Sequence, residues 1–278
     1  MKSIIICCLL FGSMVYAQEQ TSCCMSATEE FASFAGNAAF VALHETPEPF
    51  VLKLEGGTVK MIPADDKKEA RIFEVRSPNP TNNYLFVFHE WWGMNDYIKQ
   101  EAEKLRKELG DVTVIALDLY DGKVATTPQD ASQLMQAVKD KRARTIIKAV
   151  MSYIGKDAKV ATIGWCFGGG WSMQSALMLG KQAVGCVMYY GMPEKDLNKL
   201  KTLRCDVLGI FATQDGYITP KVVAEFQKNM KAAKKNLEVH NYDAVHAFAN
   251  PSNPKYDKAH ADDAYEKVKT FLKTKFGL

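Results

Sequence analysis

A glycine-rich turn at residues 164–170 constrains the fold of this chain more than any other stretch. The apolar run Val160 to Ile163 leads into the turn, and a predicted helix from Trp171 to Leu179 leads out of it. A strand, a tight turn and a helix with one nucleophile at the apex form a nucleophile elbow, usually written G-x-S-x-G. Here Cys166 takes the place of the serine. The alternative is a buried cysteine in a glycine-rich loop.

The residues around Cys166 suit a reactive thiol. Glycines on both sides of a nucleophile relieve the crowding of a strained turn. The N-terminus of the following helix is expected to lower the pKa of the thiol and to present free backbone N–H groups to an anion.

Apolar runs and helical patterns alternate along most of the chain. Continuous apolar runs predict strands covered on both faces, and helices between them predict a mostly parallel sheet. We therefore expect an α/β fold with helices flanking a central sheet and an antiparallel entry at its start. The predicted strands are 51–54, 59–62, 70–75, 85–88, 112–117, 160–163, 183–190, 207–212 and 237–242. The predicted helices are 96–109, one or two within 129–154, 171–179, 220–234 and 259–275.

Candidate catalytic side chains follow the predicted strands. Active sites of such sheets lie at the carboxyl ends of the strands. Glu90, Tyr120, Cys166, Asp215 and His246 all occupy that position in the sequence. The chain order of nucleophile, acid and base is that of the α/β-hydrolases. The pattern predicts a catalytic triad of Cys166, His246 and Asp215.

Each of these roles has an alternative. His246 follows the last predicted strand, which favours a general base over a surface histidine. Asp215 is predicted to orient His246, although it is also an Asp-Gly turn residue, and Asp243 is a second candidate for the acid. Glu90 is expected near Cys166, where it competes for the thiol proton or for the imidazole partner of the thiol. The alternatives for Glu90 are a solvated loop residue and a core ion-pair partner.

The loop around Trp91 offers further candidates. The backbone N–H groups of Trp91 and Phe167 are expected to form an oxyanion hole. The Trp92 side chain is either a core residue or a pocket wall. His89-Glu90 lacks the H-E-x-x-H spacing of a zinc site, and the predicted mechanism requires neither a metal nor an organic cofactor.

The first 17 residues have the pattern of a secretory signal peptide. Lys2 precedes an apolar stretch, and small residues stand at the cleavage positions of Val15-Tyr16-Ala17. The alternative of an uncleaved membrane anchor is disfavoured, because the apolar run is shorter than the roughly 20 residues of a span. We expect an exported protein, periplasmic or secreted, without stable membrane insertion. Residues 18–48 are then an N-terminal extension of weak helical character, and residues 49–278 are the catalytic domain.

The net charge limits the classes of binding partner, and the number of cysteines limits how the thiols can pair. A net charge of +3 on 278 residues does not favour a nucleic-acid partner. An odd number of cysteines in an exported protein leaves at least one unpaired or intermolecular thiol. The predicted signal peptide contains two of the seven cysteines, and the others are Cys23, Cys24, Cys166, Cys186 and Cys205. Of these, Cys186 and Cys205 are expected to be buried small hydrophobes.

Taken together, these motifs resemble the dienelactone hydrolase (carboxymethylenebutenolidase) family. The matching stretches are 89–93, 119–120, 164–169, Asp215 and 246–248, and the resemblance covers about residues 50–276. It implies an α/β-hydrolase fold with Cys166 as nucleophile, His246 as base and Asp215 as its orienter. It also implies that Glu90 helps to convert a resting thiol into a thiolate when substrate binds.

Departures from the family concern the substrate. Arginines hold the free carboxylate of dienelactone in the family, whereas Asp121-Gly122-Lys123 and Ala249-Asn250 stand at those places here. Lys123 offers a point charge without bidentate geometry. Val245 stands where the family often has glycine.

The function expected from the sequence is a cysteine-dependent hydrolase of small esters or lactones. Its substrate pocket is expected to include Trp92, Tyr120 and Lys123. A general carboxylesterase, a peptidase-like acyl hydrolase and a non-catalytic secreted thiol protein are the alternatives. The pattern does not determine the oligomeric state.

Overall fold

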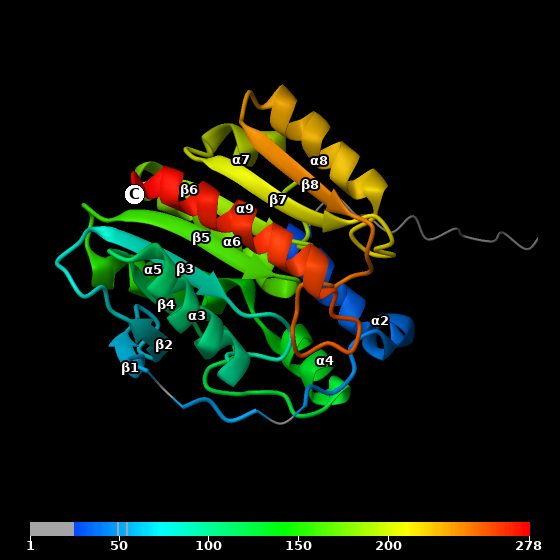
Figure 1. Ribbon diagram of the computed structural model, residues 1–278, viewed down its shortest axis with the longest axis horizontal. Coiled ribbons are helices and arrows are strands. Elements are labelled where there is room, and N and C mark those ends of the chain that lie inside the picture. The colour runs from blue at the N-terminus through cyan, green and yellow to red at the C-terminus, as the bar shows by residue number, and fades with distance from the viewer. Residues whose placement is uncertain (1–24, 49, 54) are drawn as a thin grey trace, which may run out of the picture.

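A mixed β-sheet forms the centre of the protein (Figure 1). The computed structural model describes residues 25–48, 50–53 and 55–278, and within these residues eight strands form one sheet. The strands are β1 (Thr58–Pro63), β2 (Glu69–Val75), β3 (Asn83–Phe88), β4 (Thr113–Leu117), β5 (Lys159–Trp165), β6 (Ala183–Tyr189), β7 (Asp206–Ala212) and β8 (Leu237–Tyr242). Their order is β1-β2-β4-β3-β5-β6-β7-β8. The pairs β1–β2 and β2–β4 are antiparallel, and the remaining pairs are parallel.

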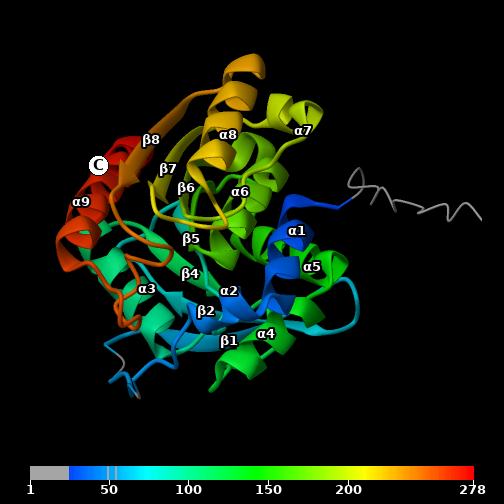
Figure 2. The same ribbon diagram turned by 90° about the vertical axis from the view of Figure 1, so that its right-hand side faces the viewer.

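Helices cover both faces of this sheet. The helices are α1 (Ala27–Ser33), α2 (Ala38–Ala42), α3 (Asp96–Leu109), α4 (Pro128–Ala137), α5 (Asp140–Ile154), α6 (Phe167–Leu179), α7 (Leu197–Thr202), α8 (Pro220–Ala232) and α9 (Lys258–Phe276). The short 3₁₀ turns η1 (Phe34–Gly36) and η2 (Gly180–Gln182) complete them. Helices α3 and α9 pack on one face, and α5 and α6 pack on the other (Figure 2). The predicted α/β fold with a mostly parallel sheet is confirmed.

The individual elements follow the sequence closely, with one wrong strand, two omitted elements and one helix that begins earlier than predicted. The predicted strand at 51–54 does not form, since residues 50–53 are neither helix nor strand and residue 54 lies outside the described residues. Val51 is 88% exposed, and the Leu52 N–H donates to the Asp96 side chain at 3.1 Å instead of to a neighbouring strand. No sequence pattern predicts the short helix α7 or the 3₁₀ turn η2, and α6 begins at Phe167 rather than at the predicted Trp171.

The strand register gathers the candidate catalytic loops at one edge of the sheet. Phe88 at the end of β3 pairs with Gly164 of β5, and Ala212 at the end of β7 pairs with Tyr242 of β8. The loops that leave these strands therefore start side by side. This is the edge where ligands bind in parallel α/β sheets.

The N-terminal segment, defined here as residues 26–44, folds onto the same end of the molecule. Ser26 and Glu29 form a capping box for α1, and the Asn37 side chain caps α2. The predicted helical character is thus present. Helix α2 lies at the end of the sheet toward which the β7 and β8 arrows point (Figure 1). Phe31 and Phe40 are buried in the main hydrophobic core, so the segment belongs to the packed structure.

The predicted signal peptide at residues 1–17 lies outside the described residues, as do Cys23 and Cys24. Among the helices that are described, none is long and apolar enough to cross a membrane.

Because β5 and α6 approach each other closely at the elbow, we expect the protein to be destabilised by a side chain at Gly164. A Cβ atom at Gly164 would lie 2.1 Å from the Gly168 carbonyl oxygen, so Gly164→Ala should force the backbone apart. Such overpacking costs roughly 1–3 kcal/mol of unfolding free energy. The matched control is Gly36→Ala, because a Cβ there would meet no described atom within 4 Å. Urea unfolding should show a lower midpoint for Gly164→Ala and a change within about 0.5 kcal/mol for Gly36→Ala. Equal stability of the two variants would contradict this packing.

Candidate active site

Cys166 occupies the turn between β5 and α6. Its φ of 56° is positive, a strained conformation for a residue other than glycine. The Cys166 N–H donates to the Tyr189 carbonyl at 3.0 Å, and the Cys166 carbonyl accepts from the Gly169 N–H at 3.0 Å. A Cβ at Gly168 would lie 2.3 Å from the Phe88 carbonyl oxygen, so only glycine allows α6 to begin this close to β3. The arrangement is the strand, turn and helix expected of a nucleophile elbow.

A hydrogen-bonded chain joins Cys166 to His246 and Asp215. His246 Nε2 lies 3.4 Å from Cys166 Sγ, and His246 Nδ1–H donates to Asp215 Oδ2 at 2.6 Å. Asp215 Oδ1 accepts from the backbone N–H groups of Tyr217 and Ile218 at 2.8 and 3.0 Å. These bonds hold the carboxylate and orient the imidazole toward the sulfur.

Asp243, the second candidate for the acid, is engaged elsewhere. Its Oδ1 accepts hydrogen bonds from the Gln214 and Thr213 side chains at 2.9 and 3.2 Å. The structure therefore pairs His246 with Asp215.

Burial dominates the electrostatics of this chain of residues. Burial raises the pKa of the Cys166 thiol, and the nearby His246 opposes it without cancelling it. The expected lowering by the helix N-terminus is therefore outweighed. Burial lowers the pKa of His246, but Asp215 and Cys166 raise it more, so the pKa lies well above its usual range. A resting thiol beside a strongly basic imidazole follows from these directions.

Glu90 is buried beside this pair, where it interacts with His246. It is 7% exposed, and within the described residues its Oε2 atom has no hydrogen-bond partner. Burial raises the pKa of Glu90 to about 7, against the opposing effects of His246 and the Asn250 side chain. The described ion pairs do not include Glu90, so neither the solvated loop nor the core ion pair fits it.

The predicted pocket residues differ in their surroundings. Trp92 and Tyr120 are buried, and the Tyr120 hydroxyl donates to the Trp91 carbonyl at 3.1 Å, so Tyr120 supports the Trp91 loop. Lys123 is exposed at the surface. A cavity of about 100 Å³ instead lies between α3 and α9, where Glu90 and Asn250 line it.

The N-terminal segment covers the candidate catalytic side chains. Cys166 is fully buried and His246 is 5% exposed. The rings of Phe31, Phe40 and His44 lie 6.2, 6.1 and 5.6 Å from the His246 ring, measured between centroids. A substrate therefore reaches Cys166 only when part of this cover moves.

His44 is the site residue that sequence reasoning missed. Its Nδ1 bonds the Phe40 carbonyl at 2.8 Å, and its buried Nε2 has no partner among the described residues. One ring nitrogen each of His44 and His246 and the Cys166 sulfur all lie within 4.8 Å of one another. Burial lowers the pKa of His44 to about 3, so its ring is neutral. No sequence motif includes His44, because it is far from Cys166 in sequence and precedes the sheet.

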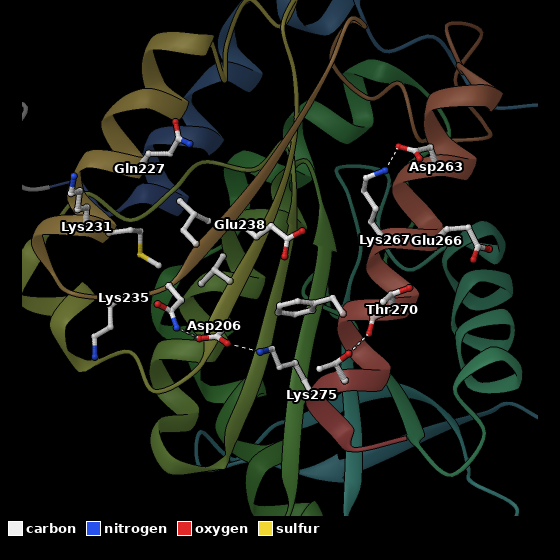
Figure 3. A pocket seen from close by; sticks show the side chains of 16 residues that line it. Asp206, Gln227, Lys231, Lys235, Glu238, Asp263, Glu266, Lys267, Thr270 and Lys275 are labelled. Carbon is white, nitrogen blue, oxygen red and sulfur yellow. Dashed lines mark hydrogen bonds and ion pairs between the residues drawn. The ribbon is translucent and has the colours of Figure 1, made fainter.

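A second cavity, of about 810 Å³, lies at the far edge of the sheet between α8, β8 and α9 (Figure 3). Lysines and carboxylates line it, and several of these pair with each other, such as Lys275 with Asp206 and Lys267 with Asp263. It contains neither Cys166 nor His246. We do not assign the catalytic chemistry to it.

Known proteins share this arrangement of sequence and fold. The sequence profile of the dienelactone hydrolase family matches residues 70–276. The carboxymethylenebutenolidase of Pseudomonas sp. strain P51 is 30% identical over 125 residues, which cover 45% of this chain and 50% of that protein. Protein usf of Aquifex pyrophilus is 28% identical over 202 residues, covering 68% of this chain and 87% of its own.

A solved structure supports the fold. The dienelactone hydrolase-like promiscuous phosphotriesterase P91 from metagenomic libraries superposes with a TM-score of 0.67 at 20% identity, covering 80% of this chain and 99% of its own. The sheet order and helix layers described above are thus those of an α/β-hydrolase fold. Because the family profile spans most of the chain, the protein belongs to the dienelactone hydrolase family and is a hydrolase acting on ester or lactone bonds.

Proposed function

We propose that the protein hydrolyses small, uncharged esters or lactones through a thioester formed on Cys166. The observation that carries this proposal is the hydrogen-bonded chain from Cys166 Sγ through His246 to Asp215 at the apex of a strained elbow. A nucleophile, a base and an orienting acid in this geometry are the parts of an acyl-transfer site.

The reaction proceeds in two halves. His246 Nε2 takes the Cys166 thiol proton, and the thiolate attacks the carbonyl carbon to give a tetrahedral oxyanion. The oxyanion collapses, the C–O bond breaks, and the leaving alkoxide takes the proton from His246. Water then attacks the thioester while His246 accepts its proton, which releases the carboxylic acid and returns the proton to the sulfur.

Two backbone N–H groups are proposed to stabilise the oxyanion. Burial and Glu90 raise the pKa of the Cys166 thiol, and the adjacent Phe167 N–H lowers it. In the described part of the chain, the Trp91 N–H makes no hydrogen bond to another backbone group. Loss of one such donor costs roughly 3–4 kcal/mol of transition-state stabilisation in a well-studied protease.

The charges around the site favour an uncharged substrate. The cavity beside the site contains Glu90 and Asn250, and a buried carboxylate repels a substrate carboxylate. Lys123 is exposed, and a lysine does not offer the bidentate geometry with which an arginine holds a carboxylate. We also propose that the chain is exported, on the pattern of its first 17 residues.

The first test compares hydrolysis of p-nitrophenyl acetate and of dienelactone by the wild type and its variants. Cys166→Ala and His246→Ala should each reduce kcat/KM by roughly 10³-fold or more, because nucleophile and base act as a unit. Cys205→Ala, which removes a buried thiol outside the site, should retain wild-type rates. The wild type should prefer the acetate ester.

Other outcomes would assign a different function. Full activity in Cys166→Ala would place the nucleophile elsewhere. A reactive Cys166 thiol without turnover of any ester, lactone or peptide substrate would point to a non-catalytic thiol protein.

A second prediction concerns Glu90 and the thiol. Burial raises the pKa of Cys166, and ionised Glu90 raises it further by like-charge repulsion. Glu90→Gln removes that negative charge, so the thiolate should form at lower pH than in the wild type. The pH profile of iodoacetamide alkylation, with Cys166→Ala as background, measures this. A profile that moves to higher pH in Glu90→Gln would contradict the proposed repulsion.

A third prediction concerns access to the site. Phe40→Ala thins the cover over His246 and should speed alkylation of Cys166 under native conditions. Phe226→Ala, a matched buried phenylalanine on α8, should be destabilised similarly, by about 3–5 kcal/mol, without that acceleration. Equal alkylation rates in both variants would show that the N-terminal segment does not control access.

A further inference from the structure

Three metal-binding atoms converge inside the site. The Cys166 sulfur and one ring nitrogen each of His44 and His246 lie within 4.8 Å of one another, and all three residues are buried. The His246 nitrogen nearest the sulfur is Nε2, at 3.4 Å. A thiolate and two imidazoles form a ligand set that suits zinc and other late first-row divalent ions.

Both imidazoles are held as metal-binding histidines usually are. His246 Nδ1–H donates to the Asp215 carboxylate at 2.6 Å, and His44 Nδ1–H donates to the Phe40 carbonyl at 2.8 Å. In protein metal sites the ring nitrogen that does not bind the ion almost always makes such a bond, which fixes the tautomer and orients the other nitrogen. His44 Nε2 is therefore presented as a lone pair, and His246 Nε2 offers one when it carries no proton.

The His44 nitrogen is otherwise unexplained. Its Nε2 is buried, and no described atom serves as its hydrogen-bond partner. Burying a polar atom without a hydrogen-bond partner lowers the stability of the fold. A ligand bound to His44 Nε2 would supply the missing interaction. The proposed triad does not use His44 Nε2, because His246 already forms hydrogen bonds with both Cys166 and Asp215.

We propose that Cys166, His246 and His44 together bind one zinc-like divalent metal ion. On binding, the Cys166 S–H bond breaks, as does the Nε2–H bond of a protonated His246, the protons leave to solvent, and metal bonds form to the sulfur and to both Nε2 atoms. The two histidines bind through Nε2 and keep their Nδ1 protons. Three protein ligands leave a further position for water, and the carboxylates of Asp215 and Glu90 beside the set offset the added positive charge.

Bound metal would change what the site does. Since the ion uses the nucleophile and the base, metal binding and ester hydrolysis exclude each other, a consequence that rests on the proposed function. Because His44 comes from the N-terminal segment, the ion would also tie that segment to the catalytic centre. Metal binding itself does not depend on any hydrolytic activity.

The test titrates the reduced, metal-free chain with Co²⁺ and Zn²⁺ and follows the thiolate-to-cobalt charge-transfer absorbance. The wild type should bind one equivalent and show the band, and Cys166→Ala should lack the band. His44→Phe, which keeps an aromatic ring against Trp91, should bind more weakly. Loss of an outer-shell partner alone costs about 10–100-fold in affinity, so loss of a ligand should cost about 100-fold or more. His44→Gln provides a second, polar variant, and unfolding midpoints verify that each variant is folded.

The controls separate a built site from surface binding. His260→Phe changes a histidine on α9 and should bind cobalt as the wild type does. Zinc should stop ester hydrolysis in the wild type at one equivalent, and a chelator should restore it. The proposal is wrong if both His44 variants bind as tightly as the wild type, if Cys166→Ala keeps the band, or if the wild type takes up no stoichiometric metal.

Discussion

The strained backbone at Cys166 is the constraint on which the rest of the site depends. A positive φ at a residue with a side chain is held only where the surroundings fix it. Here the Tyr189 carbonyl holds the Cys166 N–H, and Gly168 lets the first turn of α6 press against the end of β3. The parallel register of β3, β5, β7 and β8 then brings the loops of Glu90, Asp215 and His246 around the sulfur.

Burial of the site sets its chemistry. A low-dielectric environment favours neutral forms, so burial raises the pKa of the Cys166 thiol and, to about 7, that of Glu90. Contact with an opposite charge favours the charged form instead, and the Asp215 carboxylate does so for the His246 ring that it contacts. The result is a Cys166 thiol that stays protonated beside a basic imidazole. This agrees with a site closed to solvent.

The cover over the site lies outside the part of the chain that the family profile matches. The family profile begins at residue 70, whereas the N-terminal segment ends at residue 44. Phe31, Phe40 and His44 nonetheless contact the His246 ring. The Glu30–Lys195 ion pair and the Ser132–Ala35 hydrogen bond join the N-terminal segment to the body of the protein.

The sequence by itself determined the α/β fold, the bounds of most strands and helices, and the three residues that the structure joins at Cys166. These are local signals, since apolar periodicity and glycine spacing act within a few residues, and the parallel sheet then brings strand ends together. The loss of a strand at 51–54 depended on an exposed Val51 and a bond to Asp96, which no periodicity encodes. Only the tertiary structure decided the pKa directions, the surroundings of Trp92 and Tyr120, and the arrival of His44. Burial and contact between residues far apart in sequence arise from packing, because each depends on what the rest of the chain places around a group.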